Sequence, residues 1–176
     1  MMPTQPTARA GEGVTADDPI AAARANWERA GWTDAAVGMT AVTSVMRAHQ
    51  ILLARVEAAL RPFDLSFSRF ELLRLLAFSR SGSLPITKAS DRLQVHVSSV
   101  THGIRRLEDA GLVRREPHPS DGRVTLVEIT DAGRELVERA SVVLNDEVFA
   151  RPGMDDAEVH ALIGAIDSLR RDAGDY

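Results

Sequence analysis

The sequence predicts an α+β fold that is mainly helical and contains one small β-hairpin. Apolar residues recur at helical spacing over most of the chain. Residues 87–110 read as two short helices joined by a three-residue turn. Directly after them, strand-like patterns at 112–116 and 123–129 flank a turn-rich segment at 117–122. These three observations place the hairpin beside a pair of short helices, with longer helices on either side in the chain.

The N-terminal 34 residues divide into a tail and a short helix. Residues 1–18 are rich in Pro, Gly, Thr and Ala and have no apolar core, so we expect a flexible tail. Pro19 stands where the first turn of a helix favours proline, and residues 20–30 continue a helical pattern that carries Trp27. We therefore expect an N-terminal extension helix within residues 19–34.

One long helix is predicted for residues 35–61, and a second begins soon after it. Pro62 ends the long helix because it lacks a backbone donor. The next helix is expected to start near Ser68, which has capping-box spacing with Glu71. With successive residues about 100° apart, one broad arc of the long helix holds apolar side chains: Val42, Val45, Ala48, Leu52, Leu53 and Val56.

The middle of the chain combines a helix-turn-helix with a hairpin. Thr87 is expected to cap a helix that runs to about Leu93, and residues 97–110 form the next helix. Gly111 stands where a left-handed helix end favours glycine. With the strands that follow, this arrangement is a winged helix-turn-helix, which we assign to residues 64–129.

Two further helices close the chain. Thr130 caps a long helix that is expected to reach about Phe149, and a capping-box pair, Asp155 and Glu158, opens the last one. The helical regions outside the winged helix, at 35–63 and 130–172, each carry an apolar arc too wide for one neighbour. We expect them to pair across a two-fold axis in a homodimer.

Several classes of protein are excluded by composition. The chain has no cysteine, which rules out thiolate catalysis, zinc–thiolate sites and iron–sulfur ligation. Its histidines are scattered and there is no Gly-rich phosphate loop, so we expect no metal, no cofactor and no enzymatic activity. No stretch is long and apolar enough to cross a membrane, and we expect a cytoplasmic protein. The formal net charge is −4, so any nucleic-acid contact needs a local basic face.

Three stretches in the order found here resemble the MarR family of bacterial transcription regulators. They are Leu107-Glu108-Asp109-Ala110-Gly111-Leu112-Val113-Arg114-Arg115, Asp121-Gly122-Arg123, and Glu128-Ile129-Thr130-Asp131-Ala132-Gly133. The resemblance covers roughly residues 35–172. It implies a homodimer that binds a palindromic operator in double-stranded DNA, most commonly as a repressor, and releases it when a small ligand binds.

Three details refine this resemblance. The Trp-bearing helix ahead of the family core is similar to the N-terminally extended members that respond to urate or to citrate- and aconitate-like acids. His96 stands where the family usually has Ser, Thr or Asp as the cap of the recognition helix. His102 stands where Arg is common in the family. The departures at His96 and His102 both bear on base preference more than on the fold.

The start of the 97–110 helix has the side chains that a recognition helix needs. Short polar residues let the backbone approach base edges in the major groove, and arginines one turn later reach phosphate or guanine. At the wing tip we expect Asp121 to hold Arg123 toward a narrow minor groove. The predicted DNA-binding residues are Thr87, Lys88, Ser98, Ser99, Thr101, His102, Arg105, Arg106, Arg114, Arg115 and Arg123, with Asp121 as wing support.

A small organic acid is the expected effector. His49 falls within the apolar arc of the long helix, where a neutral imidazole can meet an acidic ligand. Arg69 leads the following helix and can border the same cavity, and Trp27 of the extension can cover it. The resemblance implies an effector site near this junction, so we expect the three residues to bind the ligand.

Less specific interpretations stand beside these. Acids are nearly as numerous as bases from Lys88 to Glu128, so DNA binding rests on the arrangement of the charges. His49 fits a structural residue of a core or interface, and Asp121 with Arg123 fits an ordinary surface ion pair. The alternative to DNA binding is a winged-helix module that binds another protein. The alternative to the homodimer is a monomer in which the outer helices form a lid.

Overall fold

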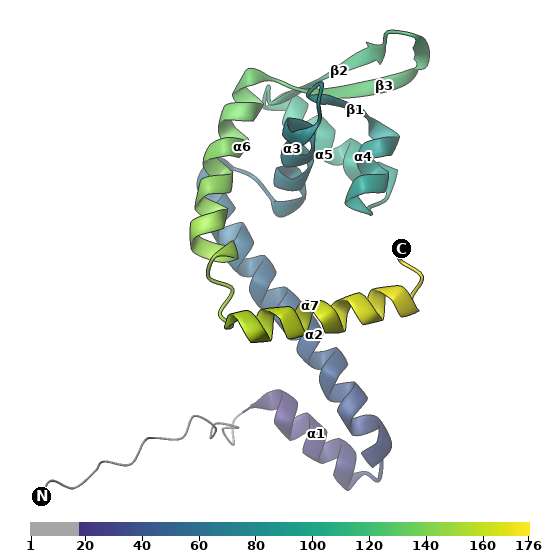
Figure 1. Cartoon of the computed structure of the whole chain (residues 1–176), viewed down its shortest axis with the longest axis vertical. Coiled ribbons are helices and arrows are strands. Elements are labelled where there is room, and N and C mark those ends of the chain that lie inside the picture. The colour runs from purple at the N-terminus through teal and green to yellow at the C-terminus, as the bar shows by residue number, and fades with distance from the viewer. Residues whose placement is uncertain (1–17) are drawn as a thin grey trace, which may run out of the picture. The chain divides into compact units, whose positions relative to one another are not determined.

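The computed structural model describes residues 18–176 of the chain. These residues form two compact units, one ending at Leu52 and the other running from Leu53 to Tyr176. Most of the described residues are helical, and the strands form one small antiparallel sheet (Figure 1). The predicted fold class is confirmed.

The first unit contains α1 (Pro19–Arg29) and most of α2 (Thr33–Leu60). The predicted extension helix is confirmed, and its cap is Asp18, whose carboxylate accepts from the Ile20 N–H at 3.0 Å. Trp27 and Trp32 pack edge-on with their ring centroids 5.4 Å apart. The tail predicted for residues 1–18 lies, except for Asp18, outside the described residues.

The long helix α2 is confirmed to within two residues of its predicted bounds. A short 3-10 turn, η1 (Arg61–Phe63), follows it and contains Pro62. Only the C-terminal end of the apolar arc is buried: Val56 is 6% exposed, whereas Val42 is 65% exposed. The arc therefore lacks a covering surface along most of its length in a single described chain.

In the second unit, α3 (Phe67–Phe78) begins one residue before Ser68 and has a different cap from the one predicted. Its cap is Ser66, whose hydroxyl accepts from the Arg69 N–H at 3.4 Å. The predicted start near Ser68 is confirmed to within one residue, but the predicted capping role of Ser68 is wrong, because Ser66 has the extended backbone of a cap and Ser68 lies inside the first turn.

The helix-turn-helix consists of α4 (Ile86–Leu93) and α5 (Val97–Asp109). Between them, Gln94 adopts a left-handed conformation with φ of 53°. The prediction that Thr87 caps α4 is wrong. Pro85 occupies the cap position and fixes an extended backbone there, so Thr87 already lies within the first helical turn.

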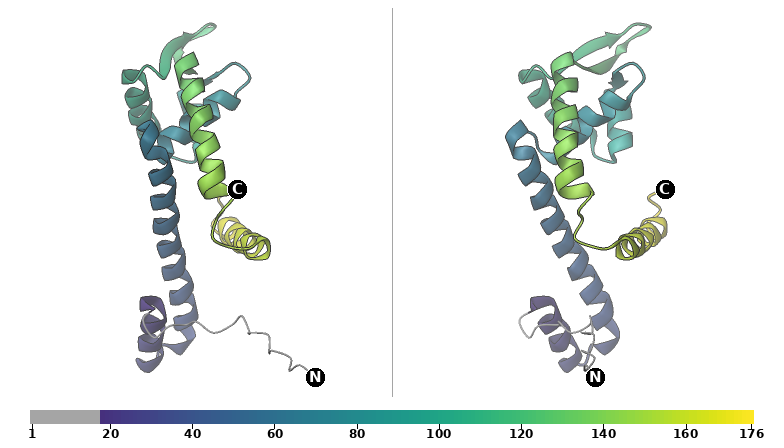
Figure 2. Two further views of the ribbon diagram at one scale, coloured as in Figure 1. Left: turned by 90° about the vertical axis from the view of Figure 1, so that its left-hand side faces the viewer. Right: turned by 60° about the vertical axis from the view of Figure 1, so that its left-hand side comes forward.

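The sheet has three strands, β1 (Ser83–Pro85), β2 (Val113–His118) and β3 (Asp121–Ile129), in the order β1-β3-β2. The predicted hairpin is confirmed as β2 and β3, and it extends beyond the helices in both views of Figure 2. Strand β1 was not predicted, because three residues ending in proline carry too little pattern.

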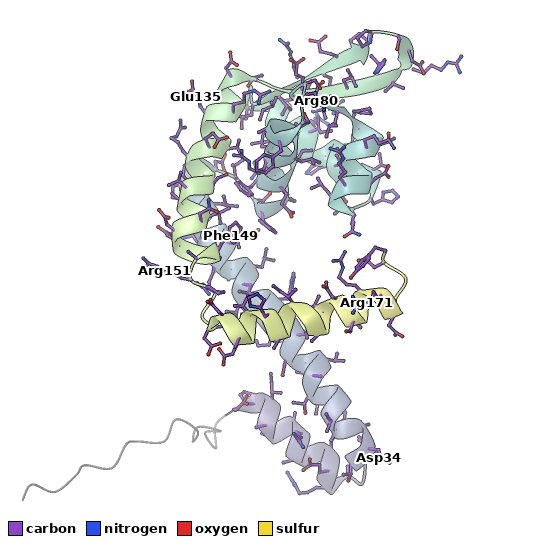
Figure 3. The ribbon with its side chains drawn as sticks, viewed as in Figure 1. Asp34, Arg80, Glu135, Phe149, Arg151 and Arg171 are labelled. Carbon is purple, nitrogen blue, oxygen red and sulfur yellow. The ribbon has the colours of Figure 1, made fainter. Side chains whose placement is uncertain are left out.

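Two further helices complete the second unit. Helix α6 (Asp131–Leu144) is capped by the Thr130 hydroxyl, as predicted, but ends in a π-helical turn, η2 (Asn145–Phe149). Helix α7 (Asp156–Asp172) has the predicted capping box, and its last turn carries Arg171, labelled in Figure 3. Arg55 of α2 holds the segment between η2 and α7 by donating to the carbonyls of Pro152 and Arg151.

A single apolar core joins α3, α5, the sheet and α6 of the second unit. Its fully buried side chains are Leu60, Leu72, Leu73, Leu76, Ile104, Leu107, Val127, Val137 and Leu144. Burial on this scale fixes α5 and the hairpin on one rigid base.

Candidate nucleic-acid interface

Helix α5 has one buried face and one exposed face. Val100, Ile104 and Leu107 are at most 3% exposed and pack into the core. The opposite face is exposed and holds polar and basic side chains from the predicted site: Ser98, Thr101, His102, Arg105 and Arg106. The helix is thus anchored by one face while the other is exposed to solvent.

His96 makes the cap of α5. Its Nδ1 accepts from the Ser98 N–H at 3.2 Å and lies 2.7 Å from the Ser98 hydroxyl oxygen. Because an accepting Nδ1 carries no proton, the hydroxyl is the donor in the second contact. The imidazole therefore fills the role for which the family resemblance implies Ser, Thr or Asp.

Two of the predicted base-reading hydroxyl groups have partners within the helix. The Ser98 hydroxyl is bonded to His96, and the Thr101 hydroxyl donates to the Val97 carbonyl at 2.8 Å. Ser99 lines two cavities between α3 and α5. Along the exposed face this leaves Ser99, His102, Arg105 and Arg106 as the predicted site residues whose side chains make no hydrogen bond within residues 18–176.

The first turn of α4 presents Thr87 and Lys88, which are both exposed. Since Pro85 and not Thr87 is the cap, the Thr87 hydroxyl is not needed to hold the helix end. Backbone N–H groups at a helix start attract anions, and the Lys88 ammonium adds a positive charge to them.

At the wing tip, Asp121 supports the backbone and not the guanidinium of Arg123. Its carboxylate accepts from the Arg123 N–H at 3.1 Å. Within residues 18–176 the Arg123 guanidinium makes no ion pair, so the expected side-chain pair is wrong. Closing the turn through the backbone is the shorter reach for an aspartate two residues away.

Arg114 and Arg115 at the base of the hairpin are paired within the chain. Arg114 lies 3.1 Å from Glu128 and 3.5 Å from Glu116, and Arg115 lies 3.5 Å from Glu108. Ion pairs this exposed contribute about 0–1 kcal/mol. Arg114 and Arg115 would therefore lose little free energy if they exchanged a glutamate carboxylate for a DNA phosphate as partner.

Arg69 lines a polar cavity of about 400 Å³ between the start of α3 and one side of α5. Its Nε donates to the Ser66 hydroxyl at 3.2 Å. The cavity brings this predicted ligand residue together with three predicted DNA-binding residues, Ser99, His102 and Arg106. Sequence analysis did not foresee this connection, because it depends on how α3 packs on α5.

The other two predicted ligand residues belong to the first unit. His49 is exposed on α2, and Trp27 is half-buried against Trp32. Near the start of α1, a separate cavity of about 420 Å³ is lined by Arg47, Met46 and Ile20, among others. A common ligand site of Trp27, His49 and Arg69 stays a prediction.

A carboxyl group lies beside the smaller cavity between α3 and α5. Glu71 lines it together with Leu93 and Val95. Partial burial raises the pKa of the Glu71 carboxyl above its usual range. Ionisation of Glu71 is therefore less favourable here than for a fully solvated carboxyl group.

Metal-binding clusters and membrane-spanning helices are two further features that the described residues could contain. Among residues 18–176, no cluster of His, Cys, Asp or Glu has a metal-binding arrangement. Over the same range, none of the helices has the length and apolar character to span a membrane.

Comparison with known proteins decides the family. The model of the MarR family matches residues 65–125, which include α3, the helix-turn-helix and the wing tip. The HTH-type transcriptional repressor IacR of Pseudomonas putida is 33% identical over 118 residues, covering 66% of this chain and 69% of IacR. The chain belongs to the MarR family.

Solved MarR structures agree in fold. Sco5413, a MarR family transcriptional regulator from Streptomyces coelicolor, is 45% identical with a TM-score of 0.71, covering 79% of this chain and 96% of Sco5413. Sco3205 from the same organism, solved in complex with DNA, is 25% identical with a TM-score of 0.66, covering 75% of this chain and 84% of Sco3205. These MarR relatives are named as transcriptional regulators and not as enzymes.

Proposed function

We propose that this MarR protein is a homodimeric repressor that binds a palindromic operator and acts in the cytoplasm. In this proposal residues 64–129 bind DNA, and the helices at 35–63 and 130–172 form the dimer. The observation that carries it is the two-faced α5, held by its buried face and exposing His102, Arg105 and Arg106 on the other. A helix presented in this way fits the major groove.

The hairpin supplies the second contact. Arg123 lies at the exposed tip of the β2–β3 wing, where a guanidinium can enter the minor groove. Lys88 and the paired Arg114 and Arg115 serve as phosphate contacts that position the protein without reading sequence.

The dimer is supported by apolar surface that a single chain leaves uncovered. On α7, Leu162, Ile163 and Leu169 are between 37% and 59% exposed. On α2, Val42 and Met46 are each 65% exposed. Burying these faces against a second copy sets two recognition helices about 34–36 Å apart, one turn of DNA.

The test is selection of bound fragments from random and genomic DNA, followed by binding measurements over a range of salt. A DNA-binding regulator yields a palindromic site and loses affinity steeply as salt rises. Charge reversal by Arg123→Glu weakens binding to all sequences, whereas the control Arg29→Glu on the exposed surface of α1, outside the proposed dimer and DNA-binding regions, does not. A winged helix that binds only proteins selects no common sequence and shows no such response.

We further propose that a small organic anion releases the operator, with Arg69 in its site. The cavity at Arg69 is also lined by His102 and Arg106, so an anion bound there competes with DNA for the same cations. Citrate, aconitate, urate and salicylate are the probes. A binding anion raises the melting temperature and lowers DNA affinity, and Arg69→Ala abolishes both effects.

A further inference from the structure

The polar groups at the start of α5 are largely used within the helix itself. The Ser98 hydroxyl donates to His96 Nδ1 at 2.7 Å, and the Thr101 hydroxyl donates to the Val97 carbonyl at 2.8 Å. A hydroxyl whose proton is already donated cannot donate to a base without breaking that bond. The first turn of α5 therefore has fewer hydroxyl groups free to donate to a base than its sequence indicates.

An apolar surface lies at the same place. Val97 is the first residue of α5 and is 41% exposed, although valine side chains are commonly buried. Thr101 follows it by one helical turn, so the two side chains are neighbours on one face. Because the Thr101 hydroxyl is turned back to the backbone, its methyl group is the free end of the side chain.

We propose that Val97 and the Thr101 methyl group read the 5-methyl group of a thymine in the major groove. Thymine is the one base of DNA with a methyl group at that edge, and apolar side chains are its complement. The inference rests on the proposed function, because it needs α5 in the groove. It assigns the specificity of the first turn to apolar contact and leaves hydrogen-bonded readout to His102 and Arg105.

The experiment replaces each thymine of the selected operator in turn by deoxyuridine, which differs only by the missing methyl group. Wild-type protein loses roughly fourfold in affinity per half-site at one thymine, the value for losing one buried methyl contact. Val97→Ala reduces this difference, and Val97→Ala combined with Thr101→Ser binds the thymine and deoxyuridine duplexes equally at that position. Val97→Thr keeps a methyl group in nearly the same volume and retains part of the discrimination.

The control is Phe78→Ala, a truncation of a 75% exposed side chain at the end of α3, outside the predicted DNA contacts and the proposed dimer helices, which leaves the deoxyuridine effect as in the wild type. If deoxyuridine has no effect at any position in a duplex that is bound, the inference is overturned while DNA binding stands. If the full effect survives in the double variant Val97→Ala with Thr101→Ser, another group reads the methyl and the inference is equally overturned. A protein that selects no duplex at all refutes the proposed function instead.

Discussion

Gly133 lies in the first turn of α6, at a position where a side chain has no space. A Cβ atom there would meet the backbone carbonyl of Leu112 and lie 2.8 Å from Cγ1 of Ile129. The glycine therefore lets α6 approach the ends of the wing strands. This close packing explains why glycine stands at this position of the Glu128–Gly133 stretch that resembles the family.

Gly133→Ala is expected to destabilise the fold by about 1–3 kcal/mol, the usual range for overpacking. The contact is with backbone, so a side chain cannot move aside to relieve it. Gly164→Ala in α7 is the control: nothing lies near its added Cβ, and alanine is expected to stabilise a helix interior by about 1 kcal/mol. Urea unfolding followed by circular dichroism measures both. Equal effects of the two substitutions would contradict the packing argument.

Glu71→Gln is expected to raise the melting temperature at neutral pH. Burial raises the pKa of the folded-state carboxyl, so ionisation of Glu71 opposes folding above that pKa. As pH falls below the unfolded value of 4.5, both states become protonated and the difference between Glu71→Gln and wild type disappears. Thermal melts from pH 7 to pH 4 test this. A difference that grows on acidification would show the opposite sign of linkage.

At the scale of the element, the recognition helix depends on its cap. The first four N–H groups of an α-helix lack helical partners, and in α5 one of them, that of Ser98, donates to His96 Nδ1. The rest of α5 is held by Val100, Ile104 and Leu107 in the core. The cap thus determines order in the first turn, whereas the core determines where the helix lies.

His96→Ala is expected to cost about 0.5–2 kcal/mol in stability, the range for losing a side-chain cap. His96→Ser supplies a hydroxyl acceptor at the same position and restores most of this stability. Unfolding by urea gives the free energies, and hydrogen exchange at the Ser98 amide reports the first turn directly. The idea fails if His96→Ser is as unstable as His96→Ala.

At the scale of the whole molecule, the two units expose more apolar surface than a monomer needs. In the first, Val37, Val42 and Met46 of α2 are all more than 60% exposed. In the second, the α7 positions Ile163 and Leu169 are more than half exposed. Adjacent exposed apolar residues on long helices mark surfaces that bind protein.

The double substitution Ile163→Asp with Leu169→Asp is expected to give monomers. A monomer binds one half-site at a time, so affinity for the full operator falls on the order of a hundredfold or more. Ala157→Asp, on the opposite face of α7, is the control and keeps the wild-type state. Sedimentation and operator binding measure the two effects. Persistence of dimers in the double variant would exclude α7 from the interface.

Local features of this protein were predictable from sequence, because they depend on residues within one or two turns of each other. The caps Thr130 and Asp155, the ending of α2 just before Pro62 and the β2–β3 hairpin all have this character. The same reasoning located the exposed polar face of α5. It erred by two residues at Ser66 and at Pro85, where neighbouring residues offer competing caps.

Only the tertiary structure decided which of the predicted site residues form ion pairs or share a cavity with other residues of the chain. Arg114 and Arg115 find Glu128 and Glu108, and Arg69 shares a cavity with Arg106. Strand β1 also exists only because it pairs with β3. The partners lie far apart in the chain or on different elements, and no local pattern encodes a contact that forms only when those elements pack together.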